Sequence, residues 1–594
     1  MNAAEYIFKK LADWGAGTVF MVSGGGALFL NAALGGEKRL RRVCCLHEQA
    51  CAMAAEGHAR ITNRAAVVSV TSGPGGTNAL TGVLGAWLDS IPMVVISGQV
   101  RTETLAANLQ PPPRQLGDQE FNIVAAAASM TKMAECVTEA SAVPDALRRA
   151  WILAHSGRPG PVWLDVPLDV QSAPVDDETD PVAEPEWNAA APSPNQIAEF
   201  ETLLATAERP AIVAGNGVRL AGARNKLRDF VERLNIPILT APSGIDLMPS
   251  GHPLFFGHPG VMGNRAANLI MQNSDCLIAL GARMSLRVIG FNWDSLAPAA
   301  RRVMVDLDPA ELNKSSFRVD LPVEADAGKF MEAVTLELPP RTEWLDYCRR
   351  VSRQYEFEEE GFSPASDHVS SYVFPKLLNR VLPPDAVVVC GNGTAYTSTF
   401  QAMEVPDGRR MFANVGCASM GYDIPAALGA QLAAPDRVVA LVTGDGSIQM
   451  NIQELETVRA QALPIKMFVY NNDGYLSIKL SQRAYCGGRL VGADPASGVH
   501  LPPLRNLAAA YGIPYFRLEN HGQCEKYLPE IMAEPGPVLT EIICDPMETL
   551  GPKAASARTA DGRFVSRPLD DMAPPVSDDE FYRNDLTGRK RDEF

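Results

Sequence analysis

Apolar and polar positions along the chain form short apolar runs separated by longer, Ala-rich segments. In residues 18–97 the runs TVFMV, RVCCL, AVVSV and PMVVIS are rich in β-branched residues and almost continuously apolar. Strands that are buried on both faces have this character. Segments such as EQACAMAAEGHARI lie between them. The pattern predicts parallel strands connected by covering helices.

Two later stretches repeat this alternation. One begins RPAIVAGNGVRLAGARNKLRDFVERL, and the other contains AVVVC, VVALVT and IKMFVYN. Polar or Pro-rich sequence at 173–192 and 349–368 predicts exposed linkers, and the first and third blocks are candidates for two copies of one architecture. We expect an α/β fold of three doubly wound parallel-sheet domains, 1–172, 193–345 and 369–547, followed by a C-terminal tail, 548–594, that lies on the surface or folds over another part of the chain.

Composition narrows the function classes. The 594 residues carry a formal net charge of −16, which argues against nucleic acids and anionic membranes as partners. Eleven cysteines include no CxxC pair, so we expect reduced thiols in a cytoplasmic protein without a disulfide framework or a zinc site. The N-terminus, MNAAEYIFKKLADWGAG, predicts an amphipathic helix rather than a signal peptide, and no uncharged apolar run is long enough to span a bilayer.

One turn, in LVTGDGSIQM, combines a strand end with a single carboxylate, Asp445. Helical spacing follows, then the strand IKMFVY and the pair Asn471 and Asn472. In a β-α-β unit both sites lie at carboxyl ends of parallel strands, where open α/β sheets bind ligands. Such oxygen donors suit Mg²⁺, which completes its shell with phosphate oxygens and water. The pattern therefore predicts a phosphorylated ligand at the N-terminus of a helix that begins near Ser447. A GDG alone is more often a plain surface turn.

GDG followed some 25 residues later by NN resembles the diphosphate-binding motif of thiamine diphosphate enzymes. The resemblance implies that Asp445, Asn472 and the backbone carbonyl of Gly474 bind Mg²⁺. It extends over about residues 1–547 to the acetohydroxyacid synthase branch, through the motifs HEQACAMAAEGHAR, SGPGGTNALTGVLGAWLDSIPMVVISGQV, RPGPVWLDVPLDV, LGARMSLRVIGFNWDSLAP and GCASMGYDIPAALGA. In that branch the three domains are pyrimidine-binding, central and diphosphate-binding. Each site lies between subunits, which implies a homodimer or homotetramer.

The same resemblance implies roles for individual residues. Glu48, between a buried strand and a helix start, would hydrogen-bond the cofactor's pyrimidine ring and favour its imino tautomer. Its alternative role is that of an ordinary first-turn helix glutamate. Gln119 matches a catalytic-pocket glutamine, and Met420 would hold the cofactor in its bent form. The remaining cofactor-binding residues implied in this way are Gly25, Pro74, Asn78, Asn392, Gly393, Gly444, Gly446, Ser447 and Tyr475.

Synthases of this branch also bind FAD in the central domain. The segments VAGNGVRL, ILTAPSG, LGARMSLR and VDLDPAEL are similar to those that surround it. A lone GxG is a weak signal, and relatives without flavin keep the same domain, so a flavin-free domain is the alternative. The resemblance implies FAD contacts from Gly215, Gly217, Thr240, Arg283, Arg287 and Asp306.

Departures from the synthase pattern concern the substrate. Synthases carry a lysine where this chain has Leu168 and a tryptophan where it has Ser481. Simple decarboxylases of the superfamily carry a glutamate at the position of Ile478 and a pair of adjacent histidines, which this chain lacks. Leu168, Ile478 and Ser481 are expected to line the acceptor pocket. The missing glutamate favours carbon–carbon ligation over aldehyde release.

We therefore expect a thiamine-diphosphate- and Mg²⁺-dependent carboligase that decarboxylates a 2-keto acid, pyruvate first, and transfers the acyl unit to a ketone or 2-keto acid. The tail DGRFVSRPLDDMAPPVSDDEF resembles tails of synthase-like enzymes of sugar and specialised pathways, which favours a keto-sugar acceptor. The alternatives are an acetolactate synthase proper, a 2-keto acid decarboxylase or C–C hydrolase that releases an aldehyde, and a non-catalytic relative. Intact Glu48, Asp445 and Asn472 argue against the last.

Overall fold

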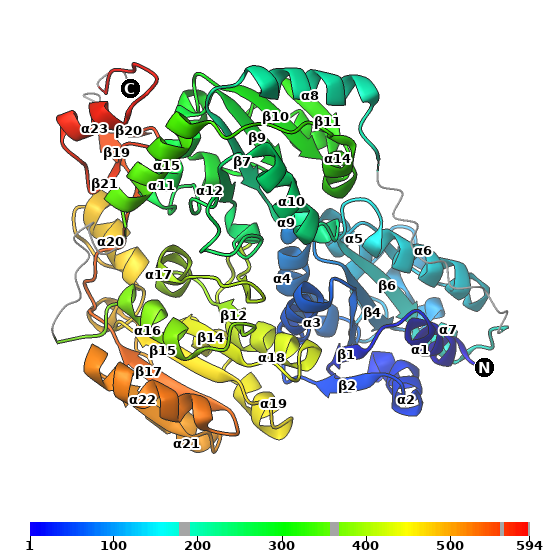
Figure 1. The fold of residues 1–594 in the computed structure, drawn as a ribbon. Coiled ribbons are helices and arrows are strands. Elements are labelled where there is room, and N and C mark those ends of the chain that lie inside the picture. Colours follow the sequence, from blue (N-terminus) through cyan, green and yellow to red (C-terminus); the bar gives the residue numbers. More distant parts are fainter. Residues whose placement is uncertain (177–189, 357–366, 559–562, 592–594) are drawn as a thin grey trace.

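The computed structural model describes residues 1–176, 190–356, 367–558 and 563–591, which form three successive α/β units and a tail (Figure 1). All strands of the three large sheets pair in parallel. The predicted fold class is thus confirmed. None of the helices in the described part of the chain has the length and apolar character needed to span a membrane.

The first unit is a six-stranded sheet with the order β2-β1-β3-β4-β6-β5. Every residue of β3 and β4 is buried, as their continuous apolar runs predict. Its strands are β1 (Thr18–Met21), β2 (Arg41–Cys44), β3 (Ala66–Val70), β4 (Met93–Gln99), β5 (Ala134–Cys136) and β6 (Pro161–Pro167). Its helices are α1 (Ala3–Asp13), α2 (Leu28–Gly36), α3 (Glu48–Thr62), α4 (Pro74–Asp89), α5 (Ile123–Ala127), α6 (Val143–His155) and α7 (Leu168–Ser172).

The third unit repeats this topology. Its strand order, β13-β12-β14-β15-β17-β16, is that of the first sheet with each strand replaced by its counterpart, so the suggested repeat of architecture is confirmed. Its strands are β12 (Val387–Cys390), β13 (Arg410–Phe412), β14 (Val439–Gly444), β15 (Lys466–Asn471), β16 (Tyr515–Leu518) and β17 (Val538–Ile543). Its helices are α16 (Val373–Val381), α17 (Thr394–Ala402), α18 (Asp423–Ala433), α19 (Glu454–Ala460), α20 (Leu476–Tyr485), α21 (Leu504–Ala510) and α22 (His521–Ala533).

The second unit has five strands in the order β11-β10-β9-β7-β8. They are β7 (Pro210–Ala214), β8 (Ile238–Thr240), β9 (Cys276–Leu280), β10 (Arg301–Asp306) and β11 (Leu321–Glu324). The helices are α8 (Pro194–Thr206), α9 (Asn216–Leu220), α10 (Arg224–Leu234), α11 (Arg265–Asn273), α12 (Leu286–Ile289), α13 (Pro309–Leu312), α14 (Ala327–Ala333) and α15 (Thr342–Gln354).

Helix α15 corrects the second predicted linker. Residues 349–354 are helical, and Val351 packs into the core of the second unit together with Leu345 and Cys348. The many charges of this segment hid apolar positions that recur at helical spacing. Residues 177–189 and 357–366, which hold most of the two predicted linkers, lie outside the described residues, and the domain boundaries stay predictions.

The first and third units meet along helices α3 and α18. A Cβ on Gly57 would stand 2.2 Å from the carbonyl oxygen of Ala426, and one on Gly429 would stand 1.9 Å from that of Ala54. Only glycine at both positions allows the two backbones to approach this closely. The contact fixes the first sheet against the third within one chain.

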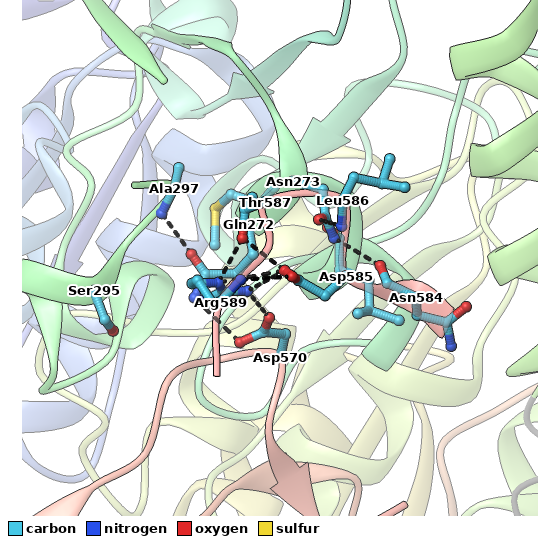
Figure 2. Close-up of polar contacts among 12 residues, drawn as sticks. Gln272, Asn273, Ser295, Ala297, Asp570, Asn584, Asp585, Leu586, Thr587 and Arg589 are labelled. Carbon is cyan, nitrogen blue, oxygen red and sulfur yellow. Dashed lines mark hydrogen bonds and ion pairs between the residues drawn. The ribbon is translucent and has the colours of Figure 1, made fainter. Parts of the chain in front are cut away.

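The tail folds over the second unit (Figure 1). This matches the second of the two predicted placements, in which the tail folds over another part of the chain. Leu569 joins the core of that unit. Figure 2 shows the buried Asn273 of α11 hydrogen-bonded to the tail, where Arg589 also forms ion pairs with Asp570 and Asp585. The tail elements are β18 (Lys553–Ala554), β19 (Ser556–Arg558), β20 (Phe564–Ser566), β21 (Met572–Ala573) and α23 (Asp578–Asn584).

Candidate active site

The carboxyl edge of β14 and β15 carries the predicted metal residues. The carboxylate of Asp445 is buried and accepts hydrogen bonds from the backbone N–H groups of Gly446, at 2.7 Å, and Gly474, at 3.0 Å. Burial raises the pKa of Asp445 to about 6. The Oδ1 atom of Asn472 is buried and has no hydrogen-bond partner in the described chain. An oxygen in that state costs about 1–3 kcal/mol, which a bound cation would offset.

The donor chemistry of this edge fits a hard cation. A carboxylate, an amide oxygen and a backbone carbonyl are the oxygen ligands that Mg²⁺ prefers. Within the described ranges, no three His, Cys, Asp or Glu side chains gather as a metal cluster. A magnesium site needs no such cluster, because phosphate and water can complete its coordination shell.

Two residues that the sequence did not indicate hold the loop of Asn471 to Asp473 in place. Lys479 of α20 donates from Nζ to the carbonyls of Asn472, at 2.8 Å, and Asp473, at 3.3 Å. Glu541 of β17 accepts a hydrogen bond of 2.6 Å from the side chain of Asn471. The only available signal for Glu541 was a single acid inside the apolar strand VLTEII. Lys479 had no signal, because its role depends on the fold of the loop.

A second buried carboxylate, Asp423 at the start of α18, was also missed. It is fully buried and accepts hydrogen bonds from the hydroxyls of Thr443 and Ser447. The Ser447 Oγ in turn accepts a bond of 3.2 Å from the N–H of Gly421. Asp423 therefore orients the predicted cofactor residue Ser447. Its signal was an acid at the start of the apolar segment DIPAALGA.

The predicted cofactor glycines fall into two groups. A Cβ on Gly25 or Gly444 would meet nothing within 4 Å, and one on Gly393 would meet only a serine hydroxyl at 3.8 Å. These three positions face open space that a ligand can fill. A Cβ on Gly446 would stand 2.2 Å from the ring of Tyr475. That glycine is therefore required by the packing of another predicted cofactor residue.

The neighbouring segments carry Asn392 and Met420. The Asn392 side chain donates to the carbonyl of Ala418, two residues before the half-buried Met420. The helix expected to begin near Ser447 is wrong in form. A short 3₁₀ turn, η8 (Ile448–Asn451), comes first and the α-helix begins only at α19. The last residue of this turn, Asn451, donates from its side-chain amide to the carbonyl of Gly421, at 2.7 Å.

The first unit gathers the other predicted set. Glu48 is buried at the first position of α3, and its Oε2 accepts a hydrogen bond of 3.0 Å from the amide of Asn78. Asn78 lies one turn into α4, which begins at Pro74. A Cβ on Gly73, the residue before α4, would stand 2.4 Å from the carbonyl oxygen of Gln119. Four predicted residues thus converge around the starts of two helices.

Four of the six predicted flavin residues line two cavities. Gly217, Arg283 and Asp306 line one of them, between the second unit and Asp89 of the first. The buried Oδ1 of Asn216, another lining residue, has no hydrogen-bond partner among the described residues.

Arg287 lines the second cavity, of about 310 Å³. His258 lies there too and shares a hydrogen bond of 2.8 Å with the hydroxyl of Thr240. Gly215 lines neither cavity. A Cβ there would stand 2.4 Å from the carbonyl of Gly281, so packing of two loops explains this glycine.

Comparison with known families agrees with this division. The model of the thiamine pyrophosphate enzyme N-terminal TPP binding domain matches residues 1–143, that of the central domain matches 197–334, and that of the C-terminal TPP binding domain matches 391–542. The chain belongs to the thiamine pyrophosphate enzyme family. Thiamine pyrophosphate and thiamine diphosphate are the same compound, so the family predicted from GDG and NN is confirmed.

Relatives within the thiamine pyrophosphate enzymes place the chain more narrowly. It is 33% identical to the acetolactate synthase large subunit of Corynebacterium glutamicum, over 89% of this chain and 84% of the relative. It is 31% identical to the acetolactate synthase isozyme 1 large subunit of Escherichia coli, over 93% and 95%. A probable acetolactate synthase large subunit of Methanocaldococcus jannaschii is 32% identical, over 93% of each. The chain is therefore a thiamine-pyrophosphate-dependent, acetolactate synthase-like enzyme.

The residues predicted to line the acceptor pocket lie on two different units. Ile478 and Ser481 are exposed on one face of α20, and the Ser481 hydroxyl donates a bond of 2.8 Å to the carbonyl of Ser477. Leu168, half-buried, begins α7 of the first unit. The proton of the Ser481 hydroxyl is used within the helix, so the oxygen can accept a hydrogen bond from a ligand but has no proton left to donate.

Proposed function

We propose that this enzyme is a Mg²⁺-dependent carboligase, which decarboxylates a 2-keto acid, pyruvate first, and transfers the acyl unit to a ketone or 2-keto acid acceptor. The observation that carries the cofactor part is the pairing of buried Asp445 with the unpartnered Oδ1 of Asn472 at the edge of the third sheet. Asp445, Asn472 and the carbonyl of Gly474 would hold Mg²⁺, and the metal would hold the diphosphate.

Bound thiamine diphosphate supplies a nucleophilic carbon and an electron sink for loss of carbon dioxide. Glu48 would hydrogen-bond the pyrimidine ring of the bound cofactor and share a proton with it. The amide of Asn78 fixes the direction of that carboxylate, because it donates to Oε2. The burial of Glu48 keeps water from competing for this proton.

Two side chains of α20 bear on the choice of acceptor. Ile478 cannot donate a proton, so it cannot perform the role that the corresponding glutamate has in simple decarboxylases. An exposed Ser481 leaves space and a hydroxyl where a tryptophan would present a flat apolar face. Both features favour ligation to an acceptor larger or more hydroxylated than pyruvate, such as a keto-sugar.

The names of the relatives favour a second candidate, an acetolactate synthase proper. Several acetolactate synthase large subunits match nearly the whole chain at 31–33% identity. In that case pyruvate itself would be the acceptor. The two candidates share every step up to the acceptor.

FAD and self-association complete the proposal. The two cavities that hold Gly217, Arg283, Asp306 and Arg287 would take FAD, and the unpartnered Oδ1 of Asn216 supports a polar ligand in the first of them. The Glu48 set and the Asp445 set belong to different units. We therefore propose that a second copy completes each site, in a homodimer or homotetramer.

An acceptor survey tests this function. Purified enzyme with thiamine diphosphate and Mg²⁺ is given pyruvate alone, then pyruvate with 2-ketobutyrate, with a bulky ketone or with a keto-sugar, and the products are identified by mass spectrometry. We expect a ligated ketol, with the larger acceptor preferred. Efficient acetolactate formation that no other acceptor improves would favour the second candidate, and aldehyde alone would contradict both.

A further inference from the structure

Six arginines line a cavity of about 380 Å³ where the three units meet. The first unit contributes Arg60 from the last turn of α3. The second unit contributes Arg219 and Arg224, and the third contributes Arg409, Arg410 and Arg437. This concentration of cations contrasts with the formal net charge of −16 of the whole chain. The cavity is separate from both predicted cofactor sets.

Carboxylates neutralise only part of this charge. Arg60 pairs with Glu56 and Asp89, while Asp246 is shared by Arg219 and Arg410, each at 2.6 Å. Arg224 pairs with Asp407, and Asp407 also pairs with Arg228, which lies outside the cavity.

The remaining two arginines have no such partner. Within the described ranges, Arg409 and Arg437 form no ion pair. Both donate to backbone carbonyls, and Arg409 also donates to the side-chain oxygen of Asn379. Burial lowers the pKa of both, although Asp385 lies near them. The arginines that line the cavity therefore outnumber the carboxylates that pair with them.

Unused hydrogen-bond donors point to a missing ligand. The Nε atoms of Arg219, Arg224 and Arg409 are buried and have no partner in the part of the chain that the structure describes. Arg409 as a whole is only 3% exposed. Helix α10 adds its N-terminus, because no described side chain caps Ala223. Free backbone N–H groups at a helix start bind anions.

We propose that this cavity binds a small anion that carries phosphate groups and links the three units. The guanidinium group of arginine can donate two parallel hydrogen bonds to a pair of phosphate oxygens, whereas the ammonium group of lysine acts as a point charge. The volume and the lining, in which no described residue is aromatic, favour a ligand smaller than a nucleotide. Two sources share this chemistry, inorganic pyrophosphate and a small phosphate ester.

The placement gives the anion a means to influence the active site. Helix α3 carries Arg60 in its last turn and begins at Glu48. Strand β13 begins at Arg410, whose guanidinium donates to the carbonyl of Arg60. Phe412 lies between the two guanidinium groups, at 5.6 and 5.2 Å from its ring centroid. An anion that fixes these arginines also fixes the helix that presents Glu48.

Calorimetric titration of the whole enzyme tests the site. The enzyme is first saturated with thiamine diphosphate and excess Mg²⁺, so that the diphosphate site is filled. It is then titrated with pyrophosphate, with glycerol 3-phosphate and with the tricarboxylate tricarballylate. We expect binding of at least one phosphate compound and about tenfold or weaker affinity for tricarballylate. The compound that binds more tightly identifies the source.

Variants separate the cavity from general charge effects. Arg224→Gln should weaken phosphate binding about tenfold or more, since it removes a charged donor. Arg228→Gln is the matched control, because it breaks the same contact with Asp407 outside the cavity, and its affinity should stay within about twofold. Ile61→Glu places a carboxylate among the arginines without removing any, and should also weaken binding.

Three results would overturn the proposal. They are no binding of either phosphate compound by the wild type, equal affinity in the wild type and Ile61→Glu, and equal affinity for tricarballylate. The first of these results, together with a changed oligomeric state in Arg224→Gln, would favour contact with a second copy instead. The titration does not depend on catalysis, so failure of the proposed carboligase function would leave its outcome unchanged.

Discussion

Replacement of Asn472 by alanine is expected to have opposite effects with and without cofactor. The Oδ1 of Asn472 is buried and unpartnered, which costs about 1–3 kcal/mol in the free protein. Asn472→Ala removes that cost. The unfolding midpoint of the cofactor-free variant should therefore equal that of the wild type or exceed it, by about 1 °C for each kcal/mol gained when all 594 residues unfold together.

With thiamine diphosphate and Mg²⁺ the order should reverse. At a cofactor concentration of about 100 times the dissociation constant, binding stabilises the wild type by about 2.7 kcal/mol. If loss of the metal ligand weakens binding about 100-fold, the same concentration stabilises the variant by only about 0.4 kcal/mol. The wild type should then unfold at the higher temperature.

Differential scanning fluorimetry with and without cofactor measures both midpoints. Asn471→Ala is the matched control, because the Asn471 side chain is satisfied by Glu541 and Asp473. It should lower both midpoints by a similar amount. An Asn472→Ala variant that is destabilised without cofactor, yet gains as much as the wild type when cofactor is added, would refute the reasoning.

Three further predictions follow from the site and the core. Glu48→Gln should keep the fold and cofactor binding but slow proton exchange at the reactive carbon of the cofactor, measured by NMR, by about 10²–10⁴-fold, and wild-type exchange would exclude the role. Ser481→Trp should impair transfer to a bulky acceptor while pyruvate consumption continues, and equal losses in both assays would contradict an acceptor-wall role. Burial raises the pKa of Asp165 to about 7, so its stabilising contribution is complete below about pH 4 and lost as the pH rises through 7. Between pH 4 and 8 the wild type should lose up to about 4 kcal/mol relative to Asp165→Asn, and parallel pH profiles of unfolding would show that Asp165 does not carry the shift.

Strands buried on both faces were predictable from sequence, because their composition is uniform. The runs that became β3, β12 and β15 needed no knowledge of their neighbours. The end of helix α15 was not predicted, because charged residues that face solvent interrupt its buried positions. Folding of the tail over another part of the chain was one of two expectations, but the sequence did not indicate the second unit, since that contact depends on isolated residues such as Leu569 and Met572.

The candidate site divides in a similar way. Asp445 and Asn472 were predictable because a motif fixes their spacing. Glu541 and Asp423 were not, because their contacts arise only when the third sheet assembles. The arginine cavity could not be predicted at all, since its residues lie between positions 60 and 437 and come from three units.

The most direct test of the account is the molar ratio of ligated ketol to carbon dioxide released from pyruvate, measured with saturating acceptor. We expect a ratio near one, with little free acetaldehyde, because Ile478 cannot supply the proton that aldehyde release requires. A ratio near zero, with acetaldehyde equal to the carbon dioxide released, would contradict carboligation and identify a decarboxylase.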